Sequence, residues 1–373
     1  SNSRTGFSAA ANGRWRAILP AMKAGGPHEL VVRGPAELRL KDVLIGEVWL
    51  AQDQAVNHEY AVKILNAGIG IDQRLQEAQV GHAFTHNNLV RVHQADVATD
   101  GKVVIAMDYL SDGAITTLAN PAGFLPLPIA VRSMIDVLQG LEHLHLNNFF
   151  HNDVKPQNIL RGPQGEAKLA DYGIVGVSPT GAPVMPSSWY VLHAAPETAA
   201  GNGIEARTDI FQAGLTMFRL LAGLGSLEAK YNSLGRTAYE AALAAGSLIS
   251  RRDFLPFIPN SVCRAVLTAI DPDPATRFQS ALEMRRALEK LSFAGHWTAD
   301  DTGRLIGSDA RHTYRFERHP AAASNAAFAA FKTNKQSGRE TRISQFTQKG
   351  LTNAEACKLE VAFLKAVVTG SAA

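Results

Sequence analysis

Residues 151–160 constrain this chain more than any other part of its 373 residues. They read His-Asn-Asp-Val-Lys-Pro-Gln-Asn-Ile-Leu and so place several different polar groups at fixed spacing. Asp153 can orient an attacking hydroxyl and accept its proton, Asn158 can hold a metal ion, and Lys155 can steady a transferred phosphate. Asp171 follows in the run Ala-Asp-Tyr-Gly and supplies a second metal-binding group. The pattern favours phosphoryl transfer.

The motifs along residues 46–292 resemble those of the protein kinase family and occur in that family's order. Lys63 lies in Tyr-Ala-Val-Lys-Ile, which resembles the strand whose lysine pairs with ATP phosphates. The surrounding residues 59–65 have the β-branched and apolar character of a strand. Residues 86–90 are similar to the segment that follows the next helix of the family. This register implies that Glu77, in a helix-compatible stretch, is the partner of Lys63.

Motifs further along the chain extend the resemblance. Residues 195–197 read Ala-Pro-Glu, as at the end of the family's activation segment. The resemblance implies that Asp209 holds the backbone of the catalytic loop and that Arg277 braces Glu197. Sugar and antibiotic kinases share the catalytic and metal-binding aspartates but lack the Ala-Pro-Glu motif and its arginine, so they match this chain less well.

The resemblance implies an α+β, bilobal protein kinase-like fold that uses ATP and Mg²⁺. Met107 falls where the family guards the adenine pocket, and backbone groups around Asp108 and Leu110 would bond the adenine edge. The implied nucleotide-binding residues are Lys63, Gly46, Val48, Ala61, Met107, Asp108 and Leu110. The implied catalytic residues are Asp153, Lys155, Lys63 and Glu77, and the implied metal ligands are Asn158 and Asp171.

Three features depart from the family pattern. Lys41 and Val43 stand at the first two glycine positions of the phosphate-covering loop, where side chains keep the backbone from the phosphates. We therefore expect weak ATP binding. Asn152 replaces the arginine that usually docks a phosphorylated activation segment, so we expect activity that does not depend on that phosphate. Tyr172 replaces a phenylalanine and adds a hydroxyl that needs a partner.

Two functions of different classes stay open at this point. The intact polar positions favour a serine/threonine protein kinase, the subgroup that Lys155 resembles, acting on a hydroxyl of a protein substrate. The altered phosphate loop is also compatible with a pseudokinase, a scaffold module that binds nucleotide or a protein partner without turnover.

The start of the chain carries a second resemblance. Residues 13–30 and 42–50 resemble the β-rich segment that precedes the nucleophile in sialate O-acetylesterases. Ala55 falls at the position of the catalytic serine, so no acyl-enzyme could form there. We interpret this part as a β-rich leader that runs into the kinase-like region.

Composition agrees with a globular enzyme of one main domain with appendages. Hydrophobic residues make up 46% and charged residues 19%, and the net charge of +3 compels no nucleic-acid partner. Cys263 and Cys357 lie far apart, which suggests a reducing, cytoplasmic location. No run of 18 apolar residues occurs, so we expect no membrane span.

The chain divides into four expected parts: a leader at 1–35, an N-lobe at 36–110, a C-lobe at 111–292 and a C-terminal domain at 293–373. Expected strands cover residues 37–41, 47–52, 59–65, 89–95 and 102–108. Apolar residues recur at helical spacing over 131–141 and 211–221. Ser280 and Thr352 each precede a glutamate by three places, which predicts the start of a helix.

The C-terminal domain resembles no known family, and we expect it to be either α+β or helical. It contains too many aromatic residues for a disordered tail: Trp297, Tyr314, Phe316, Phe328, Phe331, Phe346 and Phe363. Its cations gather at Lys332, Lys335, Arg339, Arg342 and Lys349. This basic stretch is either a solvated face or a docking site for an acidic protein partner or a nucleic acid.

Overall fold

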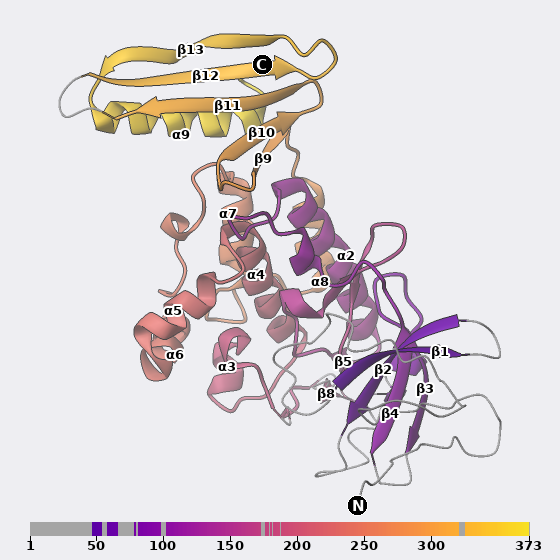
Figure 1. Cartoon of the computed structure of the whole chain (residues 1–373). Coiled ribbons are helices and arrows are strands. Elements are labelled where there is room, and N and C mark those ends of the chain that lie inside the picture. The colour runs from indigo at the N-terminus through magenta and orange to yellow at the C-terminus, as the bar shows by residue number, and fades with distance from the viewer. Residues whose placement is uncertain are drawn as a thin grey trace, which may run out of the picture.

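Within the described residues of the N-terminal lobe, four antiparallel strands form a sheet in the order β1-β2-β4-β3 (Figure 1). They are β1 (Glu47–Asp53), β2 (His58–Leu65), β3 (Val92–Val97) and β4 (Val103–Asp108). The computed structural model describes residues 47–53, 58–65, 78–79, 81–97, 102–172, 176–178, 180, 182–186, 188–320 and 325–372. The predicted leader, the predicted strand 37–41 and the position of the missing serine therefore lie outside the described residues.

One face of this sheet is apolar. Because opposed residues of an antiparallel pair share a face, Trp49, Val62 and Ala106 line one side, where they join a small apolar cluster.

Three predicted strands match the observed ones to within two residues. The predicted start of β3 was wrong: Val90 donates its N–H to the carbonyl of Leu169 instead, and the strand begins at Val92.

The C-terminal lobe is mainly helical. Its helices are α2 (Leu127–Leu146), α3 (Pro196–Ala199), α4 (Ala206–Ala222), α5 (Ser226–Leu234), α6 (Arg236–Ala244), α7 (Asn260–Ala269) and α8 (Ala281–Glu289). Its 3-10 turns are η1 (Ile115–Leu118), η2 (Pro156–Asn158), η3 (Val191–His193) and η4 (Arg251–Asp253). Its short strands pair as β5 (Phe149–Phe150) with β8 (Gly176–Val177) and β6 (Ile159–Arg161) with β7 (Ala167–Leu169).

Helix α4 is the buried centre of this lobe. Every residue from Thr208 to Leu221 is buried, including polar Asp209 and Gln212. Gly214 allows α7 to approach, because a Cβ there would lie 2.6 Å from a methyl of Ile270. The helix thus presents polar groups at a fixed place inside an apolar core, which is where the catalytic loop is attached.

Within the described residues, no single helix is long and apolar enough to cross a bilayer. Helices α4 and α5 pass that test only as a pair bent by 103°, and α4 lies in the core of the C-terminal lobe.

The C-terminal domain is α+β. Strands β9 (Gly295–Ala299), β10 (Leu305–Asp309), β11 (His312–His319), β12 (Ala326–Asn334) and β13 (Glu340–Leu351) pair with their chain neighbours in an antiparallel meander. Helix α9 (Asn353–Thr369) covers one face of this sheet (Figure 1). As predicted, Thr352 caps α9 through a capping box with Glu355.

Aromatic packing explains why the C-terminal domain folds. The ring of Phe363 in α9 lies 5.3–6.3 Å from the rings of five sheet residues: Trp297, Tyr314, Phe316, Phe328 and Phe346. Phe331 is the exception among the predicted aromatics, because it faces away from α9 and lies between the guanidinium groups of Arg315 and Arg342.

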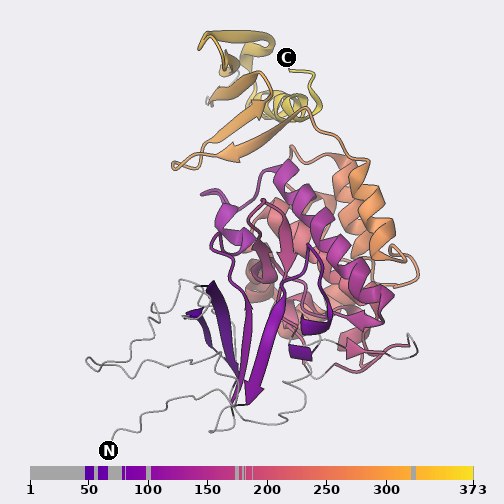
Figure 2. The ribbon, with the colours of Figure 1, turned by 90° about the vertical axis from the view of Figure 1, so that its right-hand side faces the viewer.

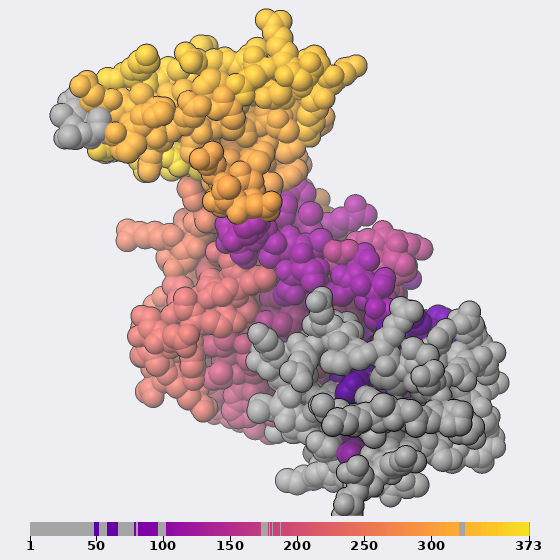
Figure 3. Space-filling view, viewed as in Figure 1, coloured from indigo at the N-terminus to yellow at the C-terminus, as the bar shows by residue number. Residues whose placement is uncertain are grey.

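The C-terminal domain rests on the C-terminal lobe through a narrow contact. Figure 2 shows it at the end of the molecule opposite the N-terminal sheet, and Figure 3 shows it above the C-terminal lobe. Phe257 of the lobe lies 6.4 Å, ring to ring, from Trp297, whose indole N–H donates to the carbonyl of Leu364. Trp297 therefore links the two cores.

Removing the central ring of the C-terminal domain should destabilise it strongly. We expect Phe363→Ala to lower its free energy of unfolding by about 3–5 kcal/mol, because the lost ring leaves a cavity. Leu146→Ala, at a position with 78% of its surface exposed, is the control and should change stability by less than about 0.5 kcal/mol. Urea unfolding followed by circular dichroism checks both, and equal midpoints would contradict the packing described.

Candidate active site

One face of the N-terminal sheet carries most of the predicted nucleotide-binding residues. Val48 opposes Lys63, and Ala61 opposes Met107, so these four side chains point to the same side. The backbone N–H of Asp108 and the carbonyl of Leu110 are already bonded within the protein. The Asp108 carboxylate also accepts from Nε2 of His93 at 2.7 Å, a contact that sequence analysis missed.

Lys63 reaches across to the predicted metal ligand Asp171. Its Nζ lies 2.8 Å from Oδ1 of Asp171, and only 5% of the lysine is exposed. Burial alone would raise the pKa of Asp171, but the charge and hydrogen bond of Lys63 lower it to about 2. Asp171 is therefore ionised at neutral pH. The predicted partner Glu77 and the predicted loop residue Gly46 lie outside the described residues.

The catalytic loop, residues 151–158, holds the predicted base in a defined orientation. Oδ2 of Asp153 accepts from Nδ2 of Asn158 at 2.8 Å and lies 3.0 Å from Nζ of Lys155. Asn158 also donates to the backbone carbonyl of Asp153. Since the Asn158 amide nitrogen is directed to Asp153, its carbonyl oxygen is the atom left to bind a metal ion.

The chemistry of the predicted metal ligands fits Mg²⁺. An ionised carboxylate at Asp171 and an amide oxygen at Asn158 are hard oxygen donors, and Mg²⁺ is usually held by one or two such groups together with substrate phosphates. The described residues contain no cluster of three or more His, Cys, Asp or Glu that could hold a metal without a substrate.

Asp209 in α4 holds the catalytic loop, as predicted. Its carboxylate accepts the backbone N–H groups of His151 at 2.8 Å and Asn152 at 2.7 Å, and Nε2 of His145 lies 2.8 Å away. These bonds stabilise an unusual backbone, because Asn152 has a φ of 56°. Asparagine tolerates this left-handed conformation better than most residues.

Gln212 is a second anchor that sequence analysis missed. Its Oε1 accepts the backbone N–H of Val154 at 3.0 Å, and its Nε2 donates to the carbonyl of Asn152 at 2.9 Å. The signal was present in the sequence: Gln212 follows Asp209 by three residues and so lies on the same face of the helix. Asp153 is thus fixed by backbone contacts on both sides.

The tyrosine of the Asp-Tyr-Gly run satisfies its extra hydroxyl. Tyr172 is buried, and its hydroxyl donates to the carbonyl of Val90 at 2.9 Å. This is the partner that the sequence required. Burial raises the pKa of Tyr172, so the hydroxyl stays protonated and remains a donor.

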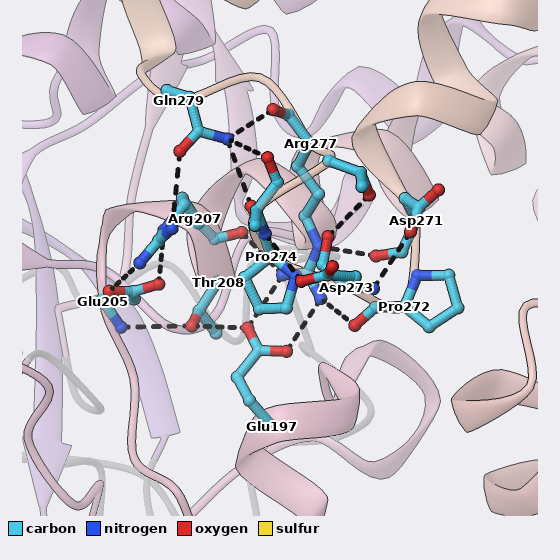
Figure 4. A network of polar contacts seen from close by, with 12 residues as sticks. Glu197, Glu205, Arg207, Thr208, Asp271, Pro272, Asp273, Pro274, Arg277 and Gln279 are labelled. Atoms are coloured by element: carbon cyan, nitrogen blue, oxygen red, sulfur yellow. Dashed lines mark hydrogen bonds and ion pairs between the residues drawn. The ribbon is translucent and has the colours of Figure 1, made fainter.

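The pair Arg277–Glu197 closes the end of the activation segment, as predicted (Figure 4). Each of the two terminal nitrogens of Arg277 lies 2.8 Å from one carboxylate oxygen of Glu197. The other N–H groups of Arg277 donate to the carbonyls of Asp271, Pro272 and Arg207. All five donors of the buried guanidinium are therefore used, and a lysine could not replace them.

Two buried histidines, one in the catalytic loop and one bonded to it, are neutral. Burial lowers the pKa of His151 and lowers that of His193 well below the usual value, and Arg219 adds to the effect on His193. His193 donates from Nδ1 to the carbonyl of Val154, while its Nε2 accepts from Arg219. A second proton on His193 would meet a donor, so the neutral form is required.

Comparison with known proteins gives one consistent result. The model of the protein kinase domain matches residues 44–264. PknJ of Mycobacterium tuberculosis is 30% identical over 270 residues, which cover 67% of this chain and 44% of PknJ. PknB of Mycobacterium leprae is 28% identical over 268 residues, covering 66% and 41%. PrkC of Bacillus subtilis is 28% identical over 270 residues, covering 70% and 39%.

The three relatives are named serine/threonine-protein kinases. This chain spans less than half the length of each of them.

The neutral histidines predict a loss of stability in mild acid. The unfolded chain binds their protons below pH about 6.5, whereas the folded chain does not. The free energy of unfolding should therefore fall as the pH drops from 7.5 to 5.5, by up to about 1.4 kcal/mol per pH unit for each histidine. Urea unfolding at several pH values measures this. His193→Gln should show a shallower fall, and a stability that is constant over this range would contradict the prediction.

Proposed function

This chain belongs to the protein kinase domain family, and from that premise we propose that it is a serine/threonine protein kinase. The reaction transfers the γ-phosphoryl group of ATP to a hydroxyl of a protein substrate. The relatives that carry the name of serine/threonine-protein kinase support the proposal.

The second oxygen of Asp153 is the observation that carries this proposal. Asp153 is 4% exposed, and its Oδ1 has no hydrogen-bond partner among the residues that the structure describes. Its Oδ2, in contrast, is held by Asn158 and Lys155. A carboxylate fixed through one oxygen can accept the proton of a substrate hydroxyl at the other. Burial of an unpartnered carboxylate oxygen is unfavourable, so a structural role alone explains it poorly.

The nucleotide would lie between the two lobes in this proposal. Lys63 would contact its phosphates, while Asn158 and Asp171 would hold Mg²⁺. Bound Mg²⁺ would neutralise charge on the transferred group. Lys155, which lies beside Asp153, would steady that group from the other side. Glu77 and Gly46 keep the roles predicted for them.

We extend the proposal to location and partners. The two cysteines, Cys263 and Cys357, are both free, which supports a cytoplasmic location. The five cations of the predicted basic stretch lie on β12, on β13 and in the turn between them, and Lys335 is bonded to Ser308 and Asp309. Arg342 is exposed, and its guanidinium lies 5.5 Å from the ring centroid of Phe331. An acidic protein segment or a nucleic acid at this hairpin remains a prediction.

The alternative is a pseudokinase, and experiment must distinguish it from an active kinase. It is suggested by Lys41 and Val43 in the phosphate loop, which lie outside the described residues. A pseudokinase could keep every contact described here and still not transfer phosphate, so turnover has to be measured directly.

Phosphoryl transfer from radiolabelled ATP tests the proposal. Wild-type protein should label itself or a generic protein substrate, and Asp153→Ala should lose at least about a hundredfold in rate, within the usual contribution of a general base. Asp253→Ala removes a carboxylate that pairs with Lys230 away from the site and should keep most activity. Circular dichroism confirms folding. Equal labelling by wild type and Asp153→Ala would overturn the assignment of the base.

Metal dependence separates the kinase from the pseudokinase. We expect Mg²⁺ to raise ATP affinity at least about tenfold, equivalent to about 1.4 kcal/mol, and Asp171→Asn to abolish that increase. Calorimetric titration of ATP in Mg²⁺ and in EDTA measures both values. Equal affinity with and without Mg²⁺ in the wild type would favour the pseudokinase.

A further inference from the structure

A cavity of about 340 Å³ lies in the C-terminal lobe, and no residue of the catalytic loop lines it. Its walls are mainly apolar side chains: Phe211 and Leu215 of α4, Leu243 of α6, Leu267 of α7, and residues 248–249. Pockets that bind small molecules are usually lined in this way, with a few polar groups at fixed places. The size and the lining of the cavity therefore fit a small apolar molecule.

The cavity reaches from the core of the lobe to its surface. Phe211 and Leu215 are buried in the core, whereas Gly246 and Ser250 are exposed on the outer side of the lining. Protein interiors are close-packed, and empty space between apolar side chains costs stability. A molecule that enters beside Gly246 and Ser250 would fill this space without unfolding the lobe.

Arg251 and Asp271 are the charged side chains among the described residues that line the cavity. Arg251 donates from Nε to Oδ1 of Asn260 at 3.0 Å and from a terminal nitrogen to the carbonyl of Ile258 at 2.9 Å. Both acceptors are neutral, and no ion pair holds Arg251 within the described part of the chain. The carboxylate of Asp271 already accepts the N–H of Asp273 at 3.0 Å. The charge of Arg251 is therefore fixed at the wall, where it favours an anionic group on a ligand.

The loop that closes one side of the cavity also holds Arg277 (Figure 4). The backbone carbonyls of Asp271 and Pro272 accept from Arg277 at 2.7 and 3.1 Å. The ring centroid of Phe211 lies 4.6 Å from Cζ of Arg277. Arg277 in turn binds Glu197, at the end of the activation segment, residues 171–197. A molecule in the cavity would thus contact three of the residues that hold this arginine.

We propose that this cavity, the C-lobe pocket, binds a small carboxylic acid with an apolar body, and that its occupancy steadies the Arg277–Glu197 pair. The carboxylate pairs with Arg251, while the apolar body lies against Phe211 and Leu267. Burial of apolar surface supplies most of the affinity, and Arg251 selects the head group. The C-lobe pocket is separate from the proposed nucleotide and catalytic sites, so the inference does not depend on phosphoryl transfer.

Three probes with chains of equal length and different head groups test the choice of ligand. Octanoate, octan-1-ol and octylamine are anionic, neutral and cationic at neutral pH, and calorimetric titration of the full chain measures the affinity of each. Octanoate should bind about tenfold more tightly than octan-1-ol, because it adds a charged hydrogen bond, and octylamine should bind most weakly. Equal affinity for octanoate and octan-1-ol, or preference for octylamine, would overturn the carboxylate assignment. Absence of binding by all three would overturn the pocket.

Three variants locate the bound probe. Arg251→Gln removes the charge and should weaken octanoate binding to the level of octan-1-ol, while octan-1-ol binding stays within about twofold. Leu267→Trp fills the C-lobe pocket and should weaken both probes about tenfold or more. Arg264→Gln is the matched control, because Arg264 is exposed on the same helix α7 and does not line the pocket. An equal loss in Arg264→Gln and Arg251→Gln would overturn the assignment. Arg251→Gln keeps the test valid if Leu267→Trp does not fold.

Amide hydrogen exchange tests the link to Arg277 and needs no turnover. The N–H groups of residues 199–202 are bonded to carbonyls of residues 195–198, which include Glu197. Saturating octanoate should slow their exchange in the wild type and leave it unchanged, at the same concentration, in Arg251→Gln. Unchanged exchange in the octanoate-bound wild type would overturn the link. An inactive wild type that still gives these results would overturn the proposed kinase function and not this inference.

Discussion

The buried carboxylate of Asp209 is the interaction on which the arrangement of the site depends. A carboxylate with no exposed surface is costly unless hydrogen bonds replace its water. Here two backbone N–H groups of the catalytic loop and one histidine provide them. The loop in turn gains the bonds that its left-handed residue Asn152 needs. Helix α4 therefore both requires the loop and fixes it, and Asp153 takes its position from this mutual dependence.

Ion pairs fix the activation segment at its two ends, around this centre. Lys63 binds Asp171 at the start of the segment, where the N-terminal sheet meets the C-terminal lobe. Arg277 binds Glu197 at its end, with all five of its donors used. The first pair, the proposed nucleotide contact, is 21% exposed at Asp171, whereas the guanidinium of the second is fully buried. The difference matches a ligand-binding contact at one end and a permanent one at the other.

Sequence analysis predicted the features that depend on local pattern or on motif order. Strand β2, the caps at Ser280 and Thr352, and the roles of Asp209 and Arg277 are confirmed. The missed features depend on contacts between distant segments. Val90 looks like strand in sequence but pairs with Leu169, and Gln212 gains its role only because the loop crosses α4 at that turn. The catalytic roles of Asp153 and Lys155 stay predictions.

In the C-terminal domain, too, the contacts between strands could not be predicted from the sequence. Its aromatic residues predicted a packed domain, yet they did not reveal that Phe331 differs from the rest. The difference follows from strand register: Phe331 opposes Arg315 on one neighbour and Arg342 on the other, so its ring lies on the face away from α9. Two guanidinium groups then cover it, and it is only 8% exposed. The two cation–π contacts therefore cover the ring on the face away from α9. Arg315 is neutralised by Glu317 and Glu340, whereas no ion pair holds Arg342 among the described residues.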